Sequence, residues 1–266
     1  MRACRYMRRY KLDKSKNIGN VIFVVEGGRP VTGGTELRLL KQIFSDILGY
    51  EVQELRRGCD EFIGHGCNSF SRVFALNLPK NQLTQLTEES LDELFRRLKA
   101  DFGIKPEDCP IFFLYDRDFL SYGPNELRGR YVKKYTDPYS DEKGNQGQLL
   151  LSYPAVESFL LSCIQEDVYR QSFFLGRDVK PELERTGFSE EQINEEEQLL
   201  HATVEMDKGL GSFGFEQYDL DHLAPTLLGV YECQQQKYTA EGKFSLLSLA
   251  AMALLELGVI VECDDV

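Results

Sequence analysis

The segment Val21-Ile22-Phe23-Val24-Val25 is a short, wholly apolar run, and Glu26-Gly27 follows it directly. A run this short and this rich in β-branched residues is typical of a strand buried on both faces, as in parallel sheets. A second apolar run, Ile111-Phe112-Phe113-Leu114-Tyr115, leads directly into Asp116-Arg117-Asp118. We therefore predict two buried strands that each end in acidic residues.

Strand and helix patterns alternate around these two runs. We predict further strands over 50–55, 72–78 and 149–151, and helices over 35–48, 88–99 and 155–164. Residues 58–69 and 123–147 lack either periodicity, so we expect loops there, the second one extended and polar. This alternation predicts an α/β fold with a central parallel sheet flanked by helices.

The rest of the chain reads as a C-terminal helical extension. Helical patterns cover about 181–185, 190–204, 224–236 and 244–257. The apolar stretch Leu246–Val261 is shorter than the ~20 residues of a membrane span, and Glu256 interrupts it, so we predict a buried helix and no membrane association. We divide the chain into a basic leader (1–20), an α/β domain (21–165) and an acidic helical region (166–266).

Composition and charge narrow the classes of function. The 266 residues are 42% hydrophobic and 28% charged, which excludes disorder or a fibrous repeat as the main description. Residues 1–180 hold 27 Lys and Arg against 25 Asp and Glu, whereas residues 181–266 hold 4 against 18. The acidic part does not attract a phosphate backbone by itself. The basic leader is either a partly disordered segment, which we prefer, or a nucleic-acid-binding arm.

The seven cysteines are scattered and form no Cys-x-x-Cys pair. Cys59, His65 and Cys67 form the densest group of zinc-ligand types, but their spacing is irregular and no fourth ligand lies nearby, which favours reduced thiols over a zinc site.

The first 20 residues contain no apolar signal segment. We therefore predict a cytoplasmic protein.

Carboxylates follow three of the predicted strands. Glu26 follows the first, Asp116 and Asp118 follow the strand over 111–115, and Glu157 lies in the first turn of the helix after 149–151. Because the carboxyl ends of parallel strands meet at one edge of a sheet, we expect these side chains to converge. Each has a simpler explanation, as a turn, a helix cap or a dipole partner. Together they favour a site for Mg²⁺ or Mn²⁺, with Asp116 and Asp118 on one side of the strand and Arg117 on the other.

These motifs resemble those of the TOPRIM domain, in which an apolar strand ends in Glu-Gly and a later one in Asp-x-Asp. The RloB-like branch, which is related to OLD-type nucleases and found at anti-phage loci, is the most similar. The matching motifs are Glu26-Gly27, Thr35-Glu36, Asp116-Arg117-Asp118 and Pro154-Ala155-Val156-Glu157. The resemblance covers residues 20–165. The loop before Thr35 is longer than usual, and Tyr153 stands where Asn commonly precedes the proline.

The resemblance implies metal-dependent cleavage of a phosphodiester. Glu26, Asp116 and Asp118 would then be the catalytic metal ligands, and Glu36 and Glu157 outer or second-metal ligands. The cations most suited to binding nucleic-acid phosphates are Arg29, Arg128, Arg130, Lys133 and Lys134. Solvated surface charge is an equally good explanation for these five residues.

Three functions stay open at this point. The first is a nuclease that cleaves DNA or RNA, tRNA included, as the effector of an anti-phage defence system. Such proteins often work with a separate ATPase, and this chain has no Gly-x-x-x-x-Gly-Lys-Ser/Thr motif of its own. The second is a catalytically weak TOPRIM-fold subunit that binds and regulates a partner ATPase. The third is a primase-like nucleotidyl transferase. An oligomer is compatible with each of them.

Overall fold

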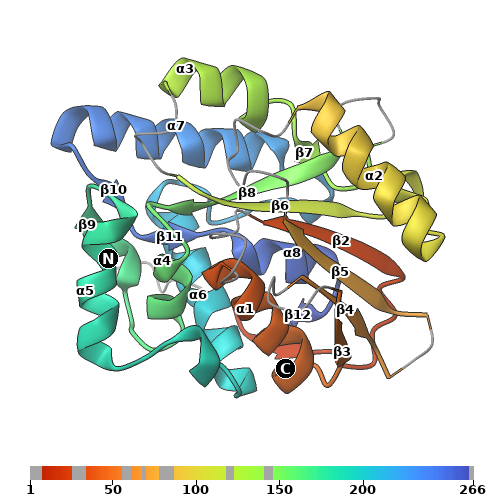
Figure 1. Ribbon diagram of the computed structural model, residues 1–266. Coiled ribbons are helices and arrows are strands. Elements are labelled where there is room, and N and C mark those ends of the chain that lie inside the picture. The colour runs from red at the N-terminus through yellow and green to blue at the C-terminus, as the bar shows by residue number, and fades with distance from the viewer. Residues whose placement is uncertain are drawn as a thin grey trace.

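The computed structural model describes residues 8–25, 34–55, 61–67, 70–77, 87–117, 123–140 and 146–263. Its centre is one mixed sheet, in which the described strands follow the order β11-β8-β6-β2-β5-β4-β3 (Figure 1). The parallel centre of this sheet consists of β2 (Asn20–Val25), β5 (Arg72–Asn77), β6 (Ile111–Asp116) and β8 (Gly147–Tyr153). The predicted α/β class is thus confirmed, and the predicted parallel arrangement holds at the centre of the sheet.

Antiparallel strands make the sheet mixed rather than purely parallel. They are β3 (Glu51–Glu54), β4 (Phe62–His65), β7 (Thr136–Asp137), which pairs with β8, and β11 (Leu247–Ser248). The predicted loop over 58–69 is wrong in part, because Phe62 is fully buried and pairs with Ala75. The predicted loop over 123–147 is also wrong in part, since it contains β7, helix α3 (Pro124–Leu127) and the π-helical turn η4 (Arg128–Val132).

Helices cover both faces of the sheet. Figure 1 shows α2 (Glu88–Phe102), α3 and α7 (Ala224–Glu241) along one face. On the other face lie α1 (Thr35–Gln42), which continues into the π-helical turn η1 (Ile43–Ile47), α4 (Glu157–Ser162) and α6 (Glu196–Ser212). The side chains of Val21 to Val25 are at most 1% exposed, and the Phe23 ring stacks on Phe112 at 5.4 Å. The strand quoted at the outset is therefore buried on both faces, as its composition predicts.

The predicted helix over 244–257 is much shorter in the structure. Only α8 (Ala250–Glu256) is helical, and it follows two short strands, β10 (Phe244–Ser245) and β11. Residues 244–245 form a strand rather than a helix because the Gln234 side chain hydrogen-bonds both the N–H and the C=O of Ser245, at 3.0 Å each. The Ser248 hydroxyl also bonds that of Ser152 at 2.8 Å. Among the described residues, no helix combines the length and apolar character needed to span a membrane.

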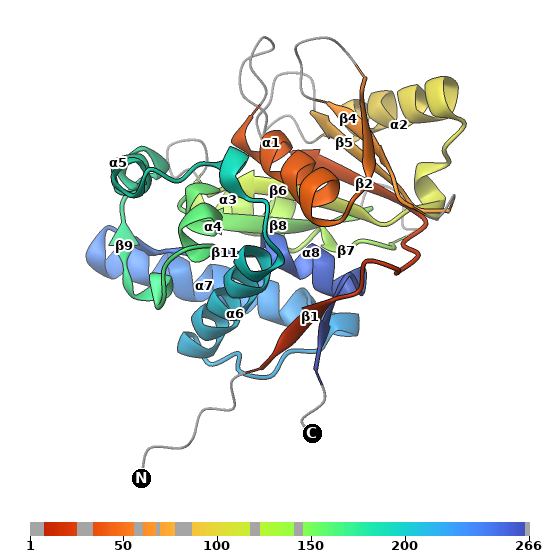
Figure 2. The ribbon, with the colours of Figure 1, turned by 90° about the horizontal axis from the view of Figure 1, so that it is seen from below.

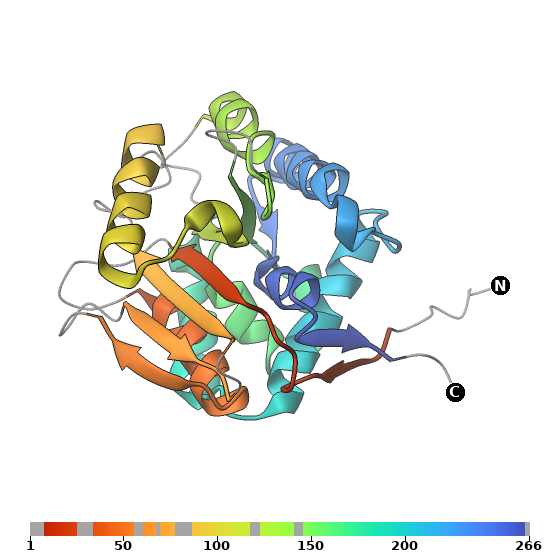
Figure 3. The ribbon, with the colours of Figure 1, turned by 90° about the vertical axis from the view of Figure 1, so that its right-hand side faces the viewer.

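Part of the predicted basic leader is an ordered strand. β1 (Tyr10–Leu12) pairs with β12 (Ile260–Glu262) away from the central sheet, and Figures 2 and 3 show the two side by side. The Tyr10 hydroxyl donates to Asp207 of α6, and the Tyr218 hydroxyl donates to the same carboxylate at 2.7 Å. Arg8 lies 4.5 Å above the Tyr218 ring. This segment therefore anchors the N-terminal part to α6 and β12.

Candidate functional site

The sheet changes its winding direction between β2 and β6. From β2 the chain crosses to β5 through α1, whereas from β6 it crosses to β8 on the other side through α3. Such a switch point opens a crevice at the carboxyl ends of the two strands, where α/β proteins bind ligands. Val25 at the end of β2 pairs with Leu114, two residues before Asp116. The strands that precede Glu26 and Asp118 therefore end at the same edge. Glu26, Arg29 and Asp118 lie outside the described residues.

Asp116 is held in place by the segment that follows β8. Its Oδ1 accepts a 2.7 Å hydrogen bond from the backbone N–H of Val156. Asp116 also pairs with Ser152 across the sheet, so the chain after Ser152 turns back over the end of β6. The next residue after Val156 is Glu157, the first residue of α4. This local turn brings two of the predicted carboxylates together.

Asp116 and Glu157 line one cavity of about 230 Å³. The other residues that line it are Pro154, Ala155, Leu175, Gly176, Arg177 and Lys180. Glu157 is only 5% exposed, and its Oε1 lies 3.5 Å from the Lys180 ammonium. Its Oε2 is buried without a hydrogen-bond partner among the described residues. A buried oxygen of this kind is costly unless something else binds it.

The cations of this cavity are not those that the sequence indicates. Arg177 and Lys180 belong to α5 (Gly176–Thr186), which begins about five residues before the predicted helix at 181–185. The signal for this earlier start is Asp178, whose carboxylate accepts a 3.0 Å bond from the Leu175 N–H. Gly176 allows the close approach, since a Cβ there would lie 2.6 Å from the Ala155 Cβ.

The predicted phosphate-binding cations in η4 and directly after it do not line this cavity. Arg128 donates from Nε to Glu232 of α7 at 3.0 Å, and Arg130 pairs with Glu126 at 3.0 Å. Lys133 is exposed, and the Lys134 ammonium lies 5.4 Å from the Tyr135 ring centroid. A nucleic-acid role for these four residues stays a prediction.

Glu36 is buried in the first turn of α1, but it is not among the residues that line the cavity. Helix α1 instead contacts η6 (Glu190–Gln192), because Arg38 pairs with Glu190 at 2.5 Å.

Arg117 lies away from the cavity, in line with strand alternation. It is 1% exposed, and its Nη2 donates to Gln235 of α7 at 3.1 Å.

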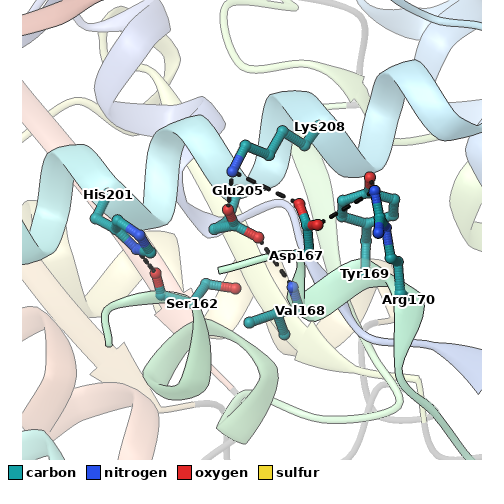
Figure 4. A network of polar contacts seen from close by, with 8 residues as sticks. All are labelled: Ser162, Asp167, Val168, Tyr169, Arg170, His201, Glu205 and Lys208. Atoms are coloured by element: carbon teal, nitrogen blue, oxygen red, sulfur yellow. Dashed lines mark hydrogen bonds and ion pairs between the residues drawn. The ribbon is translucent and has the colours of Figure 1, made fainter. Parts of the chain in front are cut away.

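A second buried carboxylate, Glu205 of α6, has a different environment (Figure 4). Its Oε2 accepts from the Val168 N–H at 2.9 Å, and its Oε1 accepts from Lys208 at 2.6 Å. The network continues through Asp167, which pairs with Arg170 at 3.2 Å. Both oxygens of Glu205 thus have strong donors, and its role is to join α6 to the turn after α4.

The donor set of the cavity suits a hard divalent ion. Mg²⁺ is commonly bound through one or two carboxylates, several waters and substrate phosphates. Asp116 and Glu157 provide two carboxylates, one with an unpartnered buried oxygen. Within the described ranges, there is no cluster of three His, Cys, Asp or Glu residues that could hold a metal ion. The gaps between these ranges include Glu26, Asp118 and Cys59.

Comparison with protein-family models, with curated proteins and with solved structures finds no match for this chain. Function must therefore be inferred from the residues and their geometry.

Proposed function

We propose that this protein is a nuclease that depends on Mg²⁺ or Mn²⁺ and cleaves phosphodiester bonds in DNA or RNA, tRNA included. The observation that carries the proposal is the cavity that Asp116 and Glu157 share at the carboxyl ends of β6 and β8, with Arg177 and Lys180 at its wall. Carboxylates for a cation and cations for a phosphate are the two halves of a metal-dependent phosphodiesterase site.

Each described residue has a distinct part in this proposal. The Val156 N–H orients Asp116, and the buried Glu157 supplies a second carboxylate that has little freedom to turn. Lys180, whose side chain is 60% exposed, would exchange Glu157 for a substrate phosphate, and Arg177 would bind the neighbouring phosphate. A bound divalent ion would stabilise the charge that develops on the attacking and leaving oxygens. Glu26 and Asp118 would complete the metal site.

The resemblance in sequence extends the proposal to a biological setting. A TOPRIM-like enzyme of the RloB-like or OLD-type branch would act in the cytoplasm as the effector of an anti-phage defence system. A separate ATPase would supply the trigger. The acidic region after residue 180, with 4 basic against 18 acidic residues, is a candidate docking surface for that partner.

The test is cleavage of single- and double-stranded DNA and RNA in Mg²⁺ or Mn²⁺, with and without an ATPase encoded next to the gene. We expect Asp116→Ala to reduce cleavage by a factor of about 10³ or more, because transition-state charge stabilisation by the ion is worth several kcal/mol. Asp46→Ala, which removes an exposed aspartate of η1, should cleave like the wild type. A triggered system in which Asp116→Ala still cleaves would exclude this site.

The same variants separate the nuclease from the alternative of a catalytically weak subunit. Calorimetric Mn²⁺ binding that disappears in Asp116→Ala, without cleavage by the triggered wild type, would favour the regulatory subunit. Incorporation of nucleotides would instead identify a primase-like enzyme.

A further inference from the structure

A stack of aromatic rings stands beside the cavity. Phe174 stacks on Tyr238 of α7 with ring centroids 5.7 Å apart and planes 27° apart. Tyr238 stacks on Phe244 of β10 at 4.7 Å and 21°. The inner ring, Phe244, is fully buried, whereas Phe174 at the outer end is 38% exposed. The stack therefore runs from the core to the surface and ends in a partly exposed ring.

Both ends of the stack are close in sequence to the cavity wall. Phe174 immediately precedes Leu175 and Gly176, which line the cavity. The inner end, Phe244, lies against Tyr153 at 6.1 Å, and Tyr153 precedes Pro154 of the cavity. Strand β9 (Ser172–Phe173) pairs with β10, and Figures 1 and 2 both show β9 beside α5 and the end of α7.

The positive charges around the stack are available to a polyanion. Arg177 and Lys243 are exposed, and neither forms an ion pair with any other described residue. Lys180 lies on the same helix as Arg177 and reaches the cavity. Lys243 directly precedes Phe244 in the chain. A partly exposed ring with cations close to it in sequence matches the base and the phosphates of a nucleotide chain.

We propose that Phe174 and Tyr238 form a stacking platform for an unpaired base, and that the substrate is single-stranded nucleic acid or an unpaired loop. This inference rests on the proposed nuclease function. A base inside a duplex has both faces covered by its neighbours, so it cannot stack on Phe174 without leaving the helix. An unpaired base extends the existing stack by one ring, and its phosphates then reach Arg177 and Lys180 at the cavity. The platform thus selects strand state rather than base identity, because every base has a π-face.

The test is binding in the absence of cleavage. A short unstructured oligonucleotide, as DNA and as RNA, and a duplex of the same sequence would be titrated without divalent ions, with 2-aminopurine in the single strand as the stacking probe. We expect the wild type to prefer the single strand and to quench the probe. Phe174→Ala should weaken single-strand binding by about 5- to 100-fold and abolish the quenching, and leave duplex binding unchanged.

Two variants serve as controls. Phe174→Tyr keeps the ring and should retain both affinity and quenching. Phe70→Ala removes another exposed phenylalanine, 71% exposed and outside the stack, and should have no effect. Equal single-strand binding by Phe174→Ala and the wild type, or a wild-type preference for the duplex, would overturn the platform.

The inference and the nuclease proposal fail in different ways. If Asp116→Ala abolishes cleavage while Phe174→Ala keeps the strand preference, the nuclease stands and the platform is rejected. If Phe174 governs single-strand binding but no metal or partner elicits cleavage, the platform stands as a binding site and the nuclease is rejected.

Discussion

Two buried glutamates of this protein, Glu157 and Glu205, have nearly the same exposure and opposite surroundings. Glu205, at 2% exposure, has a backbone N–H on one oxygen and a lysine at 2.6 Å on the other. Glu157, at 5% exposure, has one oxygen 3.5 Å from a largely exposed lysine and one with no hydrogen-bond partner in the described part of the chain. Only Glu157 lines one of the described cavities. A buried carboxylate with both oxygens hydrogen-bonded contributes to the fold, whereas one with an unsatisfied oxygen beside a cavity can accept a ligand.

The largest difference in stability is expected at Glu205. Glu205→Ala leaves the Val168 N–H and the Lys208 ammonium without their acceptor, which should lower the free energy of unfolding by about 2–4 kcal/mol. Urea denaturation followed by circular dichroism measures this loss. Glu197→Ala, at an exposed position of the same helix, should stay within about 0.5 kcal/mol of the wild type. If Glu205→Ala lowers the free energy of unfolding by less than about 1 kcal/mol, the structural role that distinguishes Glu205 from Glu157 is wrong.

Glu256 is a partly buried glutamate, and the pH dependence of stability tests its environment. Burial raises the pKa of Glu256 to about 8, the Gln148 hydrogen bond at 2.9 Å opposes the shift, and the charge of Asp137 adds to it. Between an ordinary carboxyl pKa near 4.5 and about 8, the folded protein holds a proton that the unfolded chain has released. Stability must therefore fall as pH rises through this window.

We expect the wild type to lose on the order of 4 kcal/mol between pH 5 and pH 8.5, because the interval from pH 5 to the folded pKa of about 8 spans about three pH units at about 1.4 kcal/mol each. Glu256→Gln cannot ionise and should lose less over the same range. Denaturant titrations at several pH values measure the difference, with the exposed Glu241→Gln as control. Parallel pH profiles for wild type and Glu256→Gln would show that Glu256 ionises normally.

The smallest change in stability is expected at Glu157. Glu157→Gln removes a charge from a carboxylate whose Oε2 has no hydrogen-bond partner among the described residues and whose Oε1 is 3.5 Å from Lys180. The free energy of unfolding should therefore change by less than about 1 kcal/mol in either direction. Cleavage and Mn²⁺ affinity should fall together. A stability loss as large as that of Glu205→Ala would make Glu157 a structural residue instead.

The parallel core could be predicted because its strands are continuous apolar runs. β2 and β6 need no partner in the sequence to identify them, since every side chain from Val21 to Val25 is buried. β4 and β11 were not predictable in this way. Each is short, and what holds it extended is a distant segment: β5 for Phe62, and the side chains of Gln234 and Ser152 for the 244–248 segment.

The candidate site could be predicted only on its acidic side. Asp116 and Glu157 follow strands, and that local pattern carries the information that they meet. Lys180 reaches Glu157 across 23 positions of sequence because α5 folds back onto the Pro154–Val156 turn. No periodicity encodes that packing. The pairing of Arg128, a predicted phosphate contact, with Glu232 of the acidic region likewise joins residues that are far apart in the sequence, so no local pattern predicts it.

Arg117 connects the segment that carries Asp116 to helix α7. Its backbone directly follows Asp116 and donates to the Ser152 carbonyl at 2.8 Å, while its guanidinium is held by Gln235 and lies 5.6 Å from the Phe244 ring. A side chain that is 1% exposed has no room to absorb a displacement. Because Arg117 joins the two, a shift of α7 would act on the peptide next to Asp116 through a single buried side chain.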